Sequence, residues 1–347
     1  MIQCIKPEKP NMALFNSYMD TSIQNNHYTN FGVNHELLKN KIIETTGVDK
    51  VILACNATVI LDGLHDILSN ICNIAYLPSF TFPATNQGCR IKRVYSETIA
   101  TGSDIGRPFW GVSDYDSFDY TSYAVMVNPF GSLSQPCSKP DADFLVVDNA
   151  AGVLSQAKAW LDVGADAVVY SLHATKILSA CEGGVVLFSN HYLYEKYLKY
   201  INFSFEFDLD GNRFSGKNGS NHKMSELNAA WCLMNLYKLP DNLHKREKVV
   251  KYYKEFCESK NIPFIYSLQA FWLLGKKPMN TIIKFAENFG VEIKPYYQKL
   301  HEYNKECEQT NIFNNFGFCI PTRPNLEDDE IAKILAMLRY AKKDNLI

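Results

Sequence analysis

Residues 170–184 read YSLHATKILSACEGG, and they place a single lysine, Lys176, between an apolar run and a Glu-Gly-Gly turn. The flanking segments, AVVYS at 167–171 and VVLF at 185–188, are largely continuous apolar runs. Such runs predict strands buried on both faces of a sheet. A lysine next to a buried strand can face a pocket and do covalent chemistry, whereas a surface lysine needs no such setting. Both interpretations of Lys176 follow from this stretch alone.

Outward from this stretch, short apolar runs alternate with helical patterns between residues 50 and 190. The segment 58–68 has apolar residues at helical spacing, which predicts a helix. The other segments that read as buried strands are VILA at 51–54, YAVMVN at 123–128 and FLVV at 144–147. The alternation predicts an α/β domain with a mixed, mostly parallel sheet covered by helices.

From residue 240 the pattern changes to a long helical segment followed by short strands and helices. A last helix is expected at 326–342, because its acidic opening suits a helix N-terminus. We therefore expect a large domain over 36–239, a smaller α+β domain over 240–347, and an N-terminal arm over 1–35.

The composition excludes several classes of protein. The chain has 347 residues, of which 46% are hydrophobic and 21% charged, and its net charge of −2 gives no reason to expect nucleic acid or an anionic membrane as partner. No apolar run approaches the ~18 residues of a membrane span, and the N-terminus lacks a signal-peptide core. The ten cysteines include no C-x-x-C pair, which argues against a metal site and favours reduced thiols in a cytoplasm.

Asp148 follows four apolar residues in FLVVDNAAG, so it is expected at the carboxyl end of a buried strand. That edge of an open α/β sheet is where ligands bind, although the residue could also cap the next helix. A carboxylate and Lys176 on neighbouring strand ends match the needs of pyridoxal phosphate. This cofactor forms an imine with a lysine and takes an acidic partner at its pyridine nitrogen.

Two further stretches are suited to the same cofactor. In ACNATVILDG, Thr58 and the amides after it open a helix directly after a strand, which suits a phosphate. The alternative is an Asn or Thr helix cap that needs no ligand. In LPSFTFPAT, Phe82 is able to stack on an aromatic ring, although an aromatic residue here is more often part of a core.

Taken together, these stretches resemble the StrS/DegT-type sugar aminotransferases, which have the aspartate aminotransferase fold and use pyridoxal phosphate. The resemblance runs nearly from end to end. The stretches that carry it, in order, are YTNFG (28–32), CNATVILDGL (55–64), LPSFTFPATNQG (77–88), NPFGSL (128–133), VVDNAAG (146–152), SLHATKILSACEGG (171–184), GSNHKMSELNAA (219–230), KPYYQKLHEYN (294–304) and CIPTRPNLEDDEI (319–331).

The resemblance implies a role for each matching residue. Lys176 carries the Schiff base with the cofactor, and Asp148 keeps the pyridine nitrogen protonated. The residues implied for cofactor binding are Thr58, Val59 and Ser171 at the phosphate, Phe82 and Ala150 around the ring, and Asn221 from the neighbouring subunit. Those implied near the sugar nucleotide are Tyr28, Asn30, Lys223 and His301. The sharing of Asn221 implies a homodimer.

Departures from the family pattern concern substrate recognition more than catalysis. Ala151 stands where the family usually has Gln or His, the turn at 128–130 lacks the usual histidine, and the stretch 95–122 does not align. Four side chains are candidates to contact a nucleotide diphosphate, although a charged residue is more often an ordinary surface residue. They are Arg213, Lys217, Lys223 and Tyr297.

The resemblance also narrows the reaction. Retention of Lys176 favours transamination, because the dehydratase branch carries histidine there. L-glutamate is the expected amino donor, and the acceptor is expected to be C4 of a dTDP- or UDP-linked 4-keto-6-deoxyglucose, which gives viosamine. The alternatives are a 3-keto sugar nucleotide, a small ketose phosphate, or a regulatory protein that binds the cofactor without turnover.

Overall fold

The computed structural model describes residues 1–7, 9–96, 121–134, 136, 139–208, 210–216, 218–298, 300 and 307–347. The predictions made for Lys217, for His301 and for most of the stretch 95–122 lie outside these residues.

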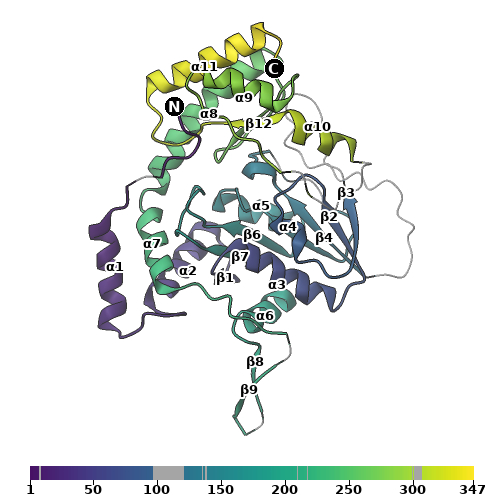
Figure 1. The fold of residues 1–347 in the computed structure, drawn as a ribbon. Coiled ribbons are helices and arrows are strands. Elements are labelled where there is room, and N and C mark those ends of the chain that lie inside the picture. The colour runs from purple at the N-terminus through teal and green to yellow at the C-terminus, as the bar shows by residue number, and fades with distance from the viewer. Residues whose placement is uncertain are drawn as a thin grey trace.

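A seven-stranded sheet forms the centre of the described chain (Figure 1). Its strands, in spatial order, are β1 (Val51–Ala54), β7 (Gly184–Phe188), β6 (Ala167–Ser171), β5 (Phe144–Asp148), β4 (Ser122–Val127), β2 (Ile74–Pro78) and β3 (Lys92–Ser96). β7 runs antiparallel to both of its neighbours, and all the remaining neighbouring strands of the sheet are parallel to each other. The expectation of a mixed, mostly parallel sheet is confirmed.

Each strand predicted from an apolar run is present, with ends shifted by at most one residue. The shift matters at β5, which extends through Asp148, so this carboxylate is the last residue of the strand itself. The predicted helix over 58–68 is α3 (Ala57–Ser69).

Two helical layers cover the sheet, and alternate strand residues face each layer because side chains of a strand alternate between its faces. On one face, Val147 and Val168 pack with α2 (Val33–Thr46), α5 (Ala157–Asp162) and α7 (Glu226–Leu236). On the other face, Val146 and Val169 pack with α3 and α6 (His191–Tyr200). Burial on both faces explains why the strand sequences are apolar throughout.

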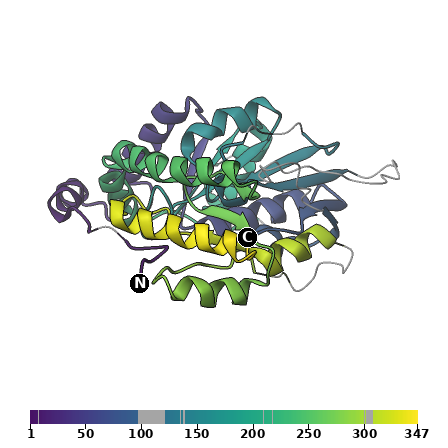
Figure 2. The same ribbon diagram turned by 90° about the horizontal axis from the view of Figure 1, so that it is seen from above.

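A second apolar core lies in the C-terminal part, above the large sheet in Figure 1 and toward the viewer in Figure 2. The long helix α8 (Leu239–Ser259) leads into it. An antiparallel sheet of β10 (Phe264–Ile265), β11 (Phe271–Leu274) and β12 (Gly317–Ile320) is flanked by α9 (Met279–Glu287), α10 (Glu308–Phe316) and α11 (Asp328–Lys343). The small β8 (Phe205–Phe207) and β9 (Arg213–Ser215) form a separate hairpin.

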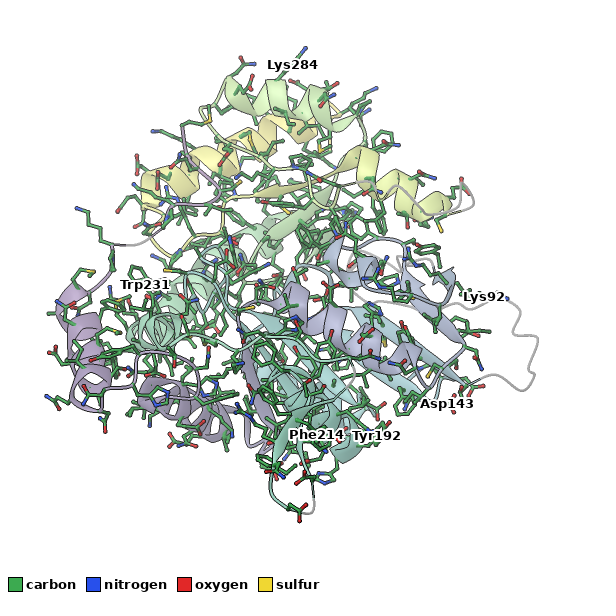
Figure 3. All side chains as sticks on the ribbon, turned by 60° about the horizontal axis from the view of Figure 1, so that its bottom comes forward. Lys92, Asp143, Tyr192, Phe214, Trp231 and Lys284 are labelled. Atoms are coloured by element: carbon green, nitrogen blue, oxygen red, sulfur yellow. The ribbon has the colours of Figure 1, made fainter. Side chains whose placement is uncertain are left out.

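The N-terminal residues contact both parts of the chain. Ile2 pairs with Val291 in the C-terminal part. In contrast, α1 (Met12–Gln24) lies beside α7, where the ring of Phe15 packs 5.5 Å from that of Trp231, which Figure 3 labels. The division at residues 36 and 240 stays a prediction. In the part of the chain that the structure describes, no helix is long and apolar enough to cross a membrane.

A buried carboxylate joins α7 to the N-terminal helices. The Oε2 atom of Glu226 accepts hydrogen bonds from the Ser22 hydroxyl at 2.7 Å and the Asn34 amide at 2.9 Å, and Oε1 accepts from the His35 amide at 2.8 Å. Asn34 and His35 lie in the first turn of α2, where amides have no partner within the helix and negative charge is favoured. Gly32 leaves room for this side chain, since a Cβ there would lie 2.5 Å from its Cδ.

We expect Glu226→Ala to lower the free energy of unfolding by about 3 kcal/mol, because it leaves two buried amides and a hydroxyl without an acceptor. Urea denaturation measures the change. Glu195→Ala, on an exposed face of α6, is the matched control and should change stability by less than about 0.5 kcal/mol. Equal effects of the two substitutions would contradict the assignment.

Candidate active site

A cavity of about 520 Å³ lies at the carboxyl ends of β5 and β6, where these strands meet the start of α3 and the C-terminal part. Open α/β sheets bind ligands at this edge. Seven of the residues predicted for the site line the cavity, namely Thr58, Phe82, Asp148, Ala150, Ser171, Lys176 and Tyr297. The fold therefore brings together residues that are up to 239 positions apart in the sequence.

Asp148 is buried at the end of β5, and both of its carboxylate oxygens accept hydrogen bonds. The Thr85 hydroxyl donates to Oδ2 at 2.6 Å, and the Ala150 amide donates to Oδ1 at 3.0 Å. Burial raises the pKa of Asp148, while these two donors and the charge of Lys176 act in the opposite direction. A carboxylate that has lost its water in this way favours a cationic partner.

Lys176 lies in the turn after β6, where its amide donates to the His173 carbonyl at 2.8 Å. Burial lowers the pKa of the Lys176 amine, and the Asp148 charge partly offsets this effect. A lowered pKa increases the fraction of neutral amine, which is the nucleophilic form. The surface interpretation of this lysine does not fit its place in the cavity.

The start of α3 differs in one detail from the expectation. Asn56 is the N-cap, and its side chain accepts the Val59 amide at 2.9 Å. The Val59 amide is thus already used within the helix, which is the capping alternative. The amides of Ala57 and Thr58 precede it in the first turn, where no intrahelical acceptor exists, and both residues line the cavity.

These residues fit pyridoxal phosphate. The desolvated carboxylate of Asp148 suits a pyridinium, and the amine of Lys176 suits an aldehyde carbon. The first turn of α3 suits a phosphate. Gly184 permits the close approach of β7 to that turn, because a Cβ on it would lie 2.6 Å from the Asn56 carbonyl carbon and 2.7 Å from the Ala57 nitrogen.

Phe82 and Ala151 both line the cavity, but Phe82 offers an aromatic ring for stacking, whereas Ala151 lacks a hydrogen-bonding side chain. The side chain of Phe82 is 57% exposed, so it is not the core residue of the alternative interpretation and is available for stacking. Ala151 lines the cavity and has no polar side-chain atom, so the hydrogen bond that the family's Gln or His would make is absent.

Other predicted residues lie away from the cavity of their own chain. Tyr28 and Asn221 are exposed, and Asn221 pairs with Asn202 in an isolated bridge. The Lys223 amine donates to the Asn202 side chain at 2.9 Å and lies over the Phe203 ring. The residues that do not line this cavity are Tyr28, Asn30, Val59, Arg213, Asn221 and Lys223. Their roles in binding stay predictions.

The sequence reasoning missed Thr85, although the motif LPSFTFPAT contains it, because its contact with Asp148 spans 63 positions. It also missed the meaning of the departure at 128–130. Tyr297, which the sequence offered as a candidate contact of a nucleotide diphosphate, is half-buried in the cavity wall, where its ring stacks on that of Phe130 with 4.6 Å between centroids. The Phe130 amide donates to the Tyr297 hydroxyl at 3.0 Å. The atypical turn therefore carries an aromatic wall of the cavity.

His173 and Glu182, from the two ends of the lysine-bearing loop, meet at the cavity with 3.5 Å between Nε2 and Oε1. The Thr175 amide lies 3.3 Å from Nδ1 and donates to it. Nδ1 is therefore an acceptor in the neutral ring, and Nε2 carries the hydrogen toward Glu182. Neither residue was given a role from the sequence.

We expect Asp148→Asn to lower the pH at which Lys176 becomes reactive, because the substitution removes the charge that raises the pKa of Lys176. Amine labelling of the cofactor-free protein over a pH series, read by peptide mass spectrometry, measures this. The exposed Lys277 in the same digests is the control and should label alike in both proteins. A midpoint for Lys176 that stays constant or rises would contradict the coupling.

Comparison with known proteins adds an independent line of support. The profile of the DegT/DnrJ/EryC1/StrS aminotransferase family matches residues 144–269, which include Asp148 and Lys176. The chain is 24% identical over 367 residues to the dTDP-4-amino-4,6-dideoxy-D-glucose transaminase of Shigella dysenteriae, covering 97% of this chain and 98% of that one.

Solved structures share the fold. DesI, crystallised in the presence of its TDP-sugar product, superposes with a TM-score of 0.78 at 22% identity and covers 98% of this chain and 93% of its own. Spr1654 of Streptococcus pneumoniae in its PMP form gives a TM-score of 0.80 at 16% identity and covers both chains fully. The resemblance to the StrS/DegT-type aminotransferases is therefore confirmed, in the fold along the whole chain and in the family profile around Asp148 and Lys176.

Proposed function

We propose that the chain is a pyridoxal phosphate-dependent aminotransferase that moves the amino group of L-glutamate to C4 of a nucleotide-linked 4-keto-6-deoxyglucose. The product is the nucleotide-linked 4-amino-4,6-dideoxyglucose, viosamine, for glycan biosynthesis. The observation that carries the proposal is that Lys176 and Asp148 line one cavity beside the first turn of α3.

Pyridoxal phosphate, when bound, supplies an aldehyde for the lysine and an aromatic ring that takes up the electron pair released at the substrate carbon. Lys176 acts first as the nucleophile that anchors the cofactor. Once its amine is free, the Nζ atom takes the proton from the donor's α-carbon. Burial lowers the pKa of this amine, so a larger fraction of it is in the basic form at neutral pH.

Asp148 accepts the pyridinium N–H, which keeps the ring nitrogen protonated. The donors from Thr85 and Ala150 hold its carboxylate in place. The first-turn amides of α3 and the hydroxyls of Thr58 and Ser171 bind the phosphate. Together these groups fix both ends of the cofactor, so that Lys176 meets the same reacting atom in each half of the reaction.

The choice of transamination, and of C4 of the sugar as the acceptor, rests on one observation each. Lys176 is present at the position where dehydratases of this family have histidine. The Shigella relative, which spans nearly the whole chain, is by its name a 4-amino-4,6-dideoxyglucose transaminase. The nucleotide, dTDP or UDP, is left to the experiment below.

The exposed position of Asn221 supports a homodimer with shared sites. Asn221 lies outside its own cavity, as expected for a residue that reaches the phosphate in the neighbouring subunit. Lys223 and the N-terminal Tyr28 and Asn30 are proposed to approach the sugar nucleotide. The nine cysteines that the structure describes are all free thiols, which supports the proposed cytoplasmic location.

The proposal predicts two half-reactions that visible absorbance can follow. The purified protein should show the band of the lysine-linked cofactor, and L-glutamate should remove that band. After glutamate is washed out, dTDP- or UDP-4-keto-6-deoxyglucose should restore it, and the faster of the two identifies the nucleotide.

Lys176→Ala is the control variant, because it binds the cofactor without forming the lysine-linked band. If glutamate bleaches the wild-type band and neither sugar restores it, the C4 assignment is wrong, and 3-keto sugars and ketose phosphates replace it. If glutamate leaves the band unchanged, the protein is not a glutamate-dependent aminotransferase.

Shared sites predict a specific outcome for a hybrid dimer of one Lys176→Ala chain and one Asn221→Ala chain. If Asn221 serves the neighbouring site, both changes fall in one site and the hybrid keeps about half of wild-type activity. If Asn221 serves its own chain's site, both sites are damaged and activity is lost. The matched control is a hybrid of Lys176→Ala with Asn288→Ala. Asn288 is the exposed C-cap residue of α9 and lies outside the cavity.

A further inference from the structure

A chain of buried hydrogen bonds leads from Tyr123 on β4, through His65 on α3, to the carboxylate of Asp148. The Tyr123 hydroxyl lies 2.7 Å from His65 Nδ1, and His65 Nε2 lies 2.8 Å from the Thr85 carbonyl oxygen. The Thr85 hydroxyl then donates to Asp148 Oδ2 at 2.6 Å. All four side chains are buried.

The direction of each hydrogen in this chain is fixed by chemistry. A carbonyl oxygen only accepts, so His65 Nε2 carries a hydrogen and donates it to Thr85. Burial lowers the pKa of His65 to about 4, so the ring is neutral at physiological pH. Its Nδ1 atom is then an acceptor, and Tyr123 is its donor.

Thr85 uses both its backbone and its side chain in the chain of bonds. Its hydroxyl hydrogen is committed to Asp148, so the Thr81 hydroxyl at 2.6 Å donates to the Thr85 oxygen. The backbone carbonyl of the same residue is held by His65. Displacing Thr85 at its carbonyl therefore displaces the hydroxyl that stabilises the carboxylate.

The helix that carries His65 is the helix whose start faces the cavity. α3 begins at Ala57, beside Thr58, and His65 lies about two turns further along. Thr85 lies on the short helix α4 (Ala84–Gln87), which packs closely on α3. A Cβ on Gly88 would come within 2.8 Å of the Asp62 Cα and 3.0 Å of His65. One rigid pair of helices thus joins the phosphate end of the site to Asp148.

We propose that His65 is a positioning residue that acts through Thr85 to hold Asp148 ionised against the pyridine nitrogen of the cofactor. The inference deepens the proposed function and rests on it, because it requires that Asp148 faces that nitrogen. Without the Thr85 donor, the carboxylate becomes more basic and takes the proton from the ring nitrogen.

The test measures whether the ring nitrogen of the cofactor is protonated, and it does not depend on turnover. Pyridoxamine phosphate labelled with ¹⁵N in its ring is bound to each full-length variant, and its ¹⁵N resonance and dissociation constant are measured. Thr85→Val removes the hydroxyl donor and Thr85→Ser keeps it. His65→Asn places its amide near the Nδ1 position and loses the contact with Thr85, whereas His65→Gln reaches the Nε2 position and keeps that contact.

Thr85→Val and His65→Asn should both shift the resonance toward the unprotonated nitrogen and weaken binding about tenfold. Thr85→Ser and His65→Gln should stay close to the wild type. Tyr123→Phe is the stability control, because it removes a buried hydrogen bond and leaves the contact between His65 and Thr85 in place.

The inference is overturned if Thr85→Val and His65→Asn give the wild-type resonance. It is also overturned if Tyr123→Phe shifts the resonance as much as His65→Asn, since general loosening then explains both. Should His65→Asn fail to fold, His65→Leu, which also removes the donor to the Thr85 carbonyl, takes its place in the same comparison with Tyr123→Phe. A wild-type protein that does not bind pyridoxamine phosphate overturns the proposed function as well, whereas binding without differences between variants overturns this inference alone.

Discussion

The burial of one carboxylate at the end of a parallel strand is the constraint on which the site depends. Asp148 ends β5 inside the protein, where an ionised group is unfavourable unless donors and a cation compensate it. The hydroxyl of Thr85 and the amide of Ala150 supply part of that compensation. These two donors do not neutralise the negative charge of the carboxylate, so the position is suited to a cation such as a pyridinium. Lys176, in the turn that follows the neighbouring strand β6, is half-buried and lines the same cavity.

The two parts of the chain contribute different properties to the cavity. The large sheet supplies Asp148 and Lys176 near its strand ends, and the start of α3 supplies the amides that we propose bind the phosphate. The C-terminal part supplies a wall, in which the stacked rings of Phe130 and Tyr297 join the two parts across 167 positions of sequence. The two departures from the family pattern that lie within the described residues are the turn at 128–130, on this aromatic side, and Ala151. The charged groups and the aromatic rings thus line the same cavity from different parts of the chain.

Glycines allow two helix starts to lie in close contact with neighbouring elements. Gly184 lets β7 lie against the first turn of α3, and Gly32 lets Glu226 reach the first turn of α2. At α2 the amides of Asn34 and His35 in the first turn are satisfied by the Glu226 carboxylate of α7 rather than by water. Asn56 caps α3 through the Val59 amide and leaves the two preceding positions facing the cavity. The unpaired amides of a helix start are therefore used for packing at α2, and we propose that they are used for ligand binding at α3.

The sequence by itself determined the class of fold, five of the seven strands of the central sheet (all but β2 and β3), and the pairing of Lys176 with Asp148. These follow from local patterns, since apolar runs define buried strands and parallel strands end at one edge. Only the tertiary structure decided that Val59 is used by a cap, that Asn221 lies outside its own cavity, and that Thr85, His65 and Tyr123 support Asp148. The hydrogen bonds among Tyr123, His65, Thr85 and Asp148 join positions 20 to 63 residues apart, where spacing along the chain carries no information about which side chains meet.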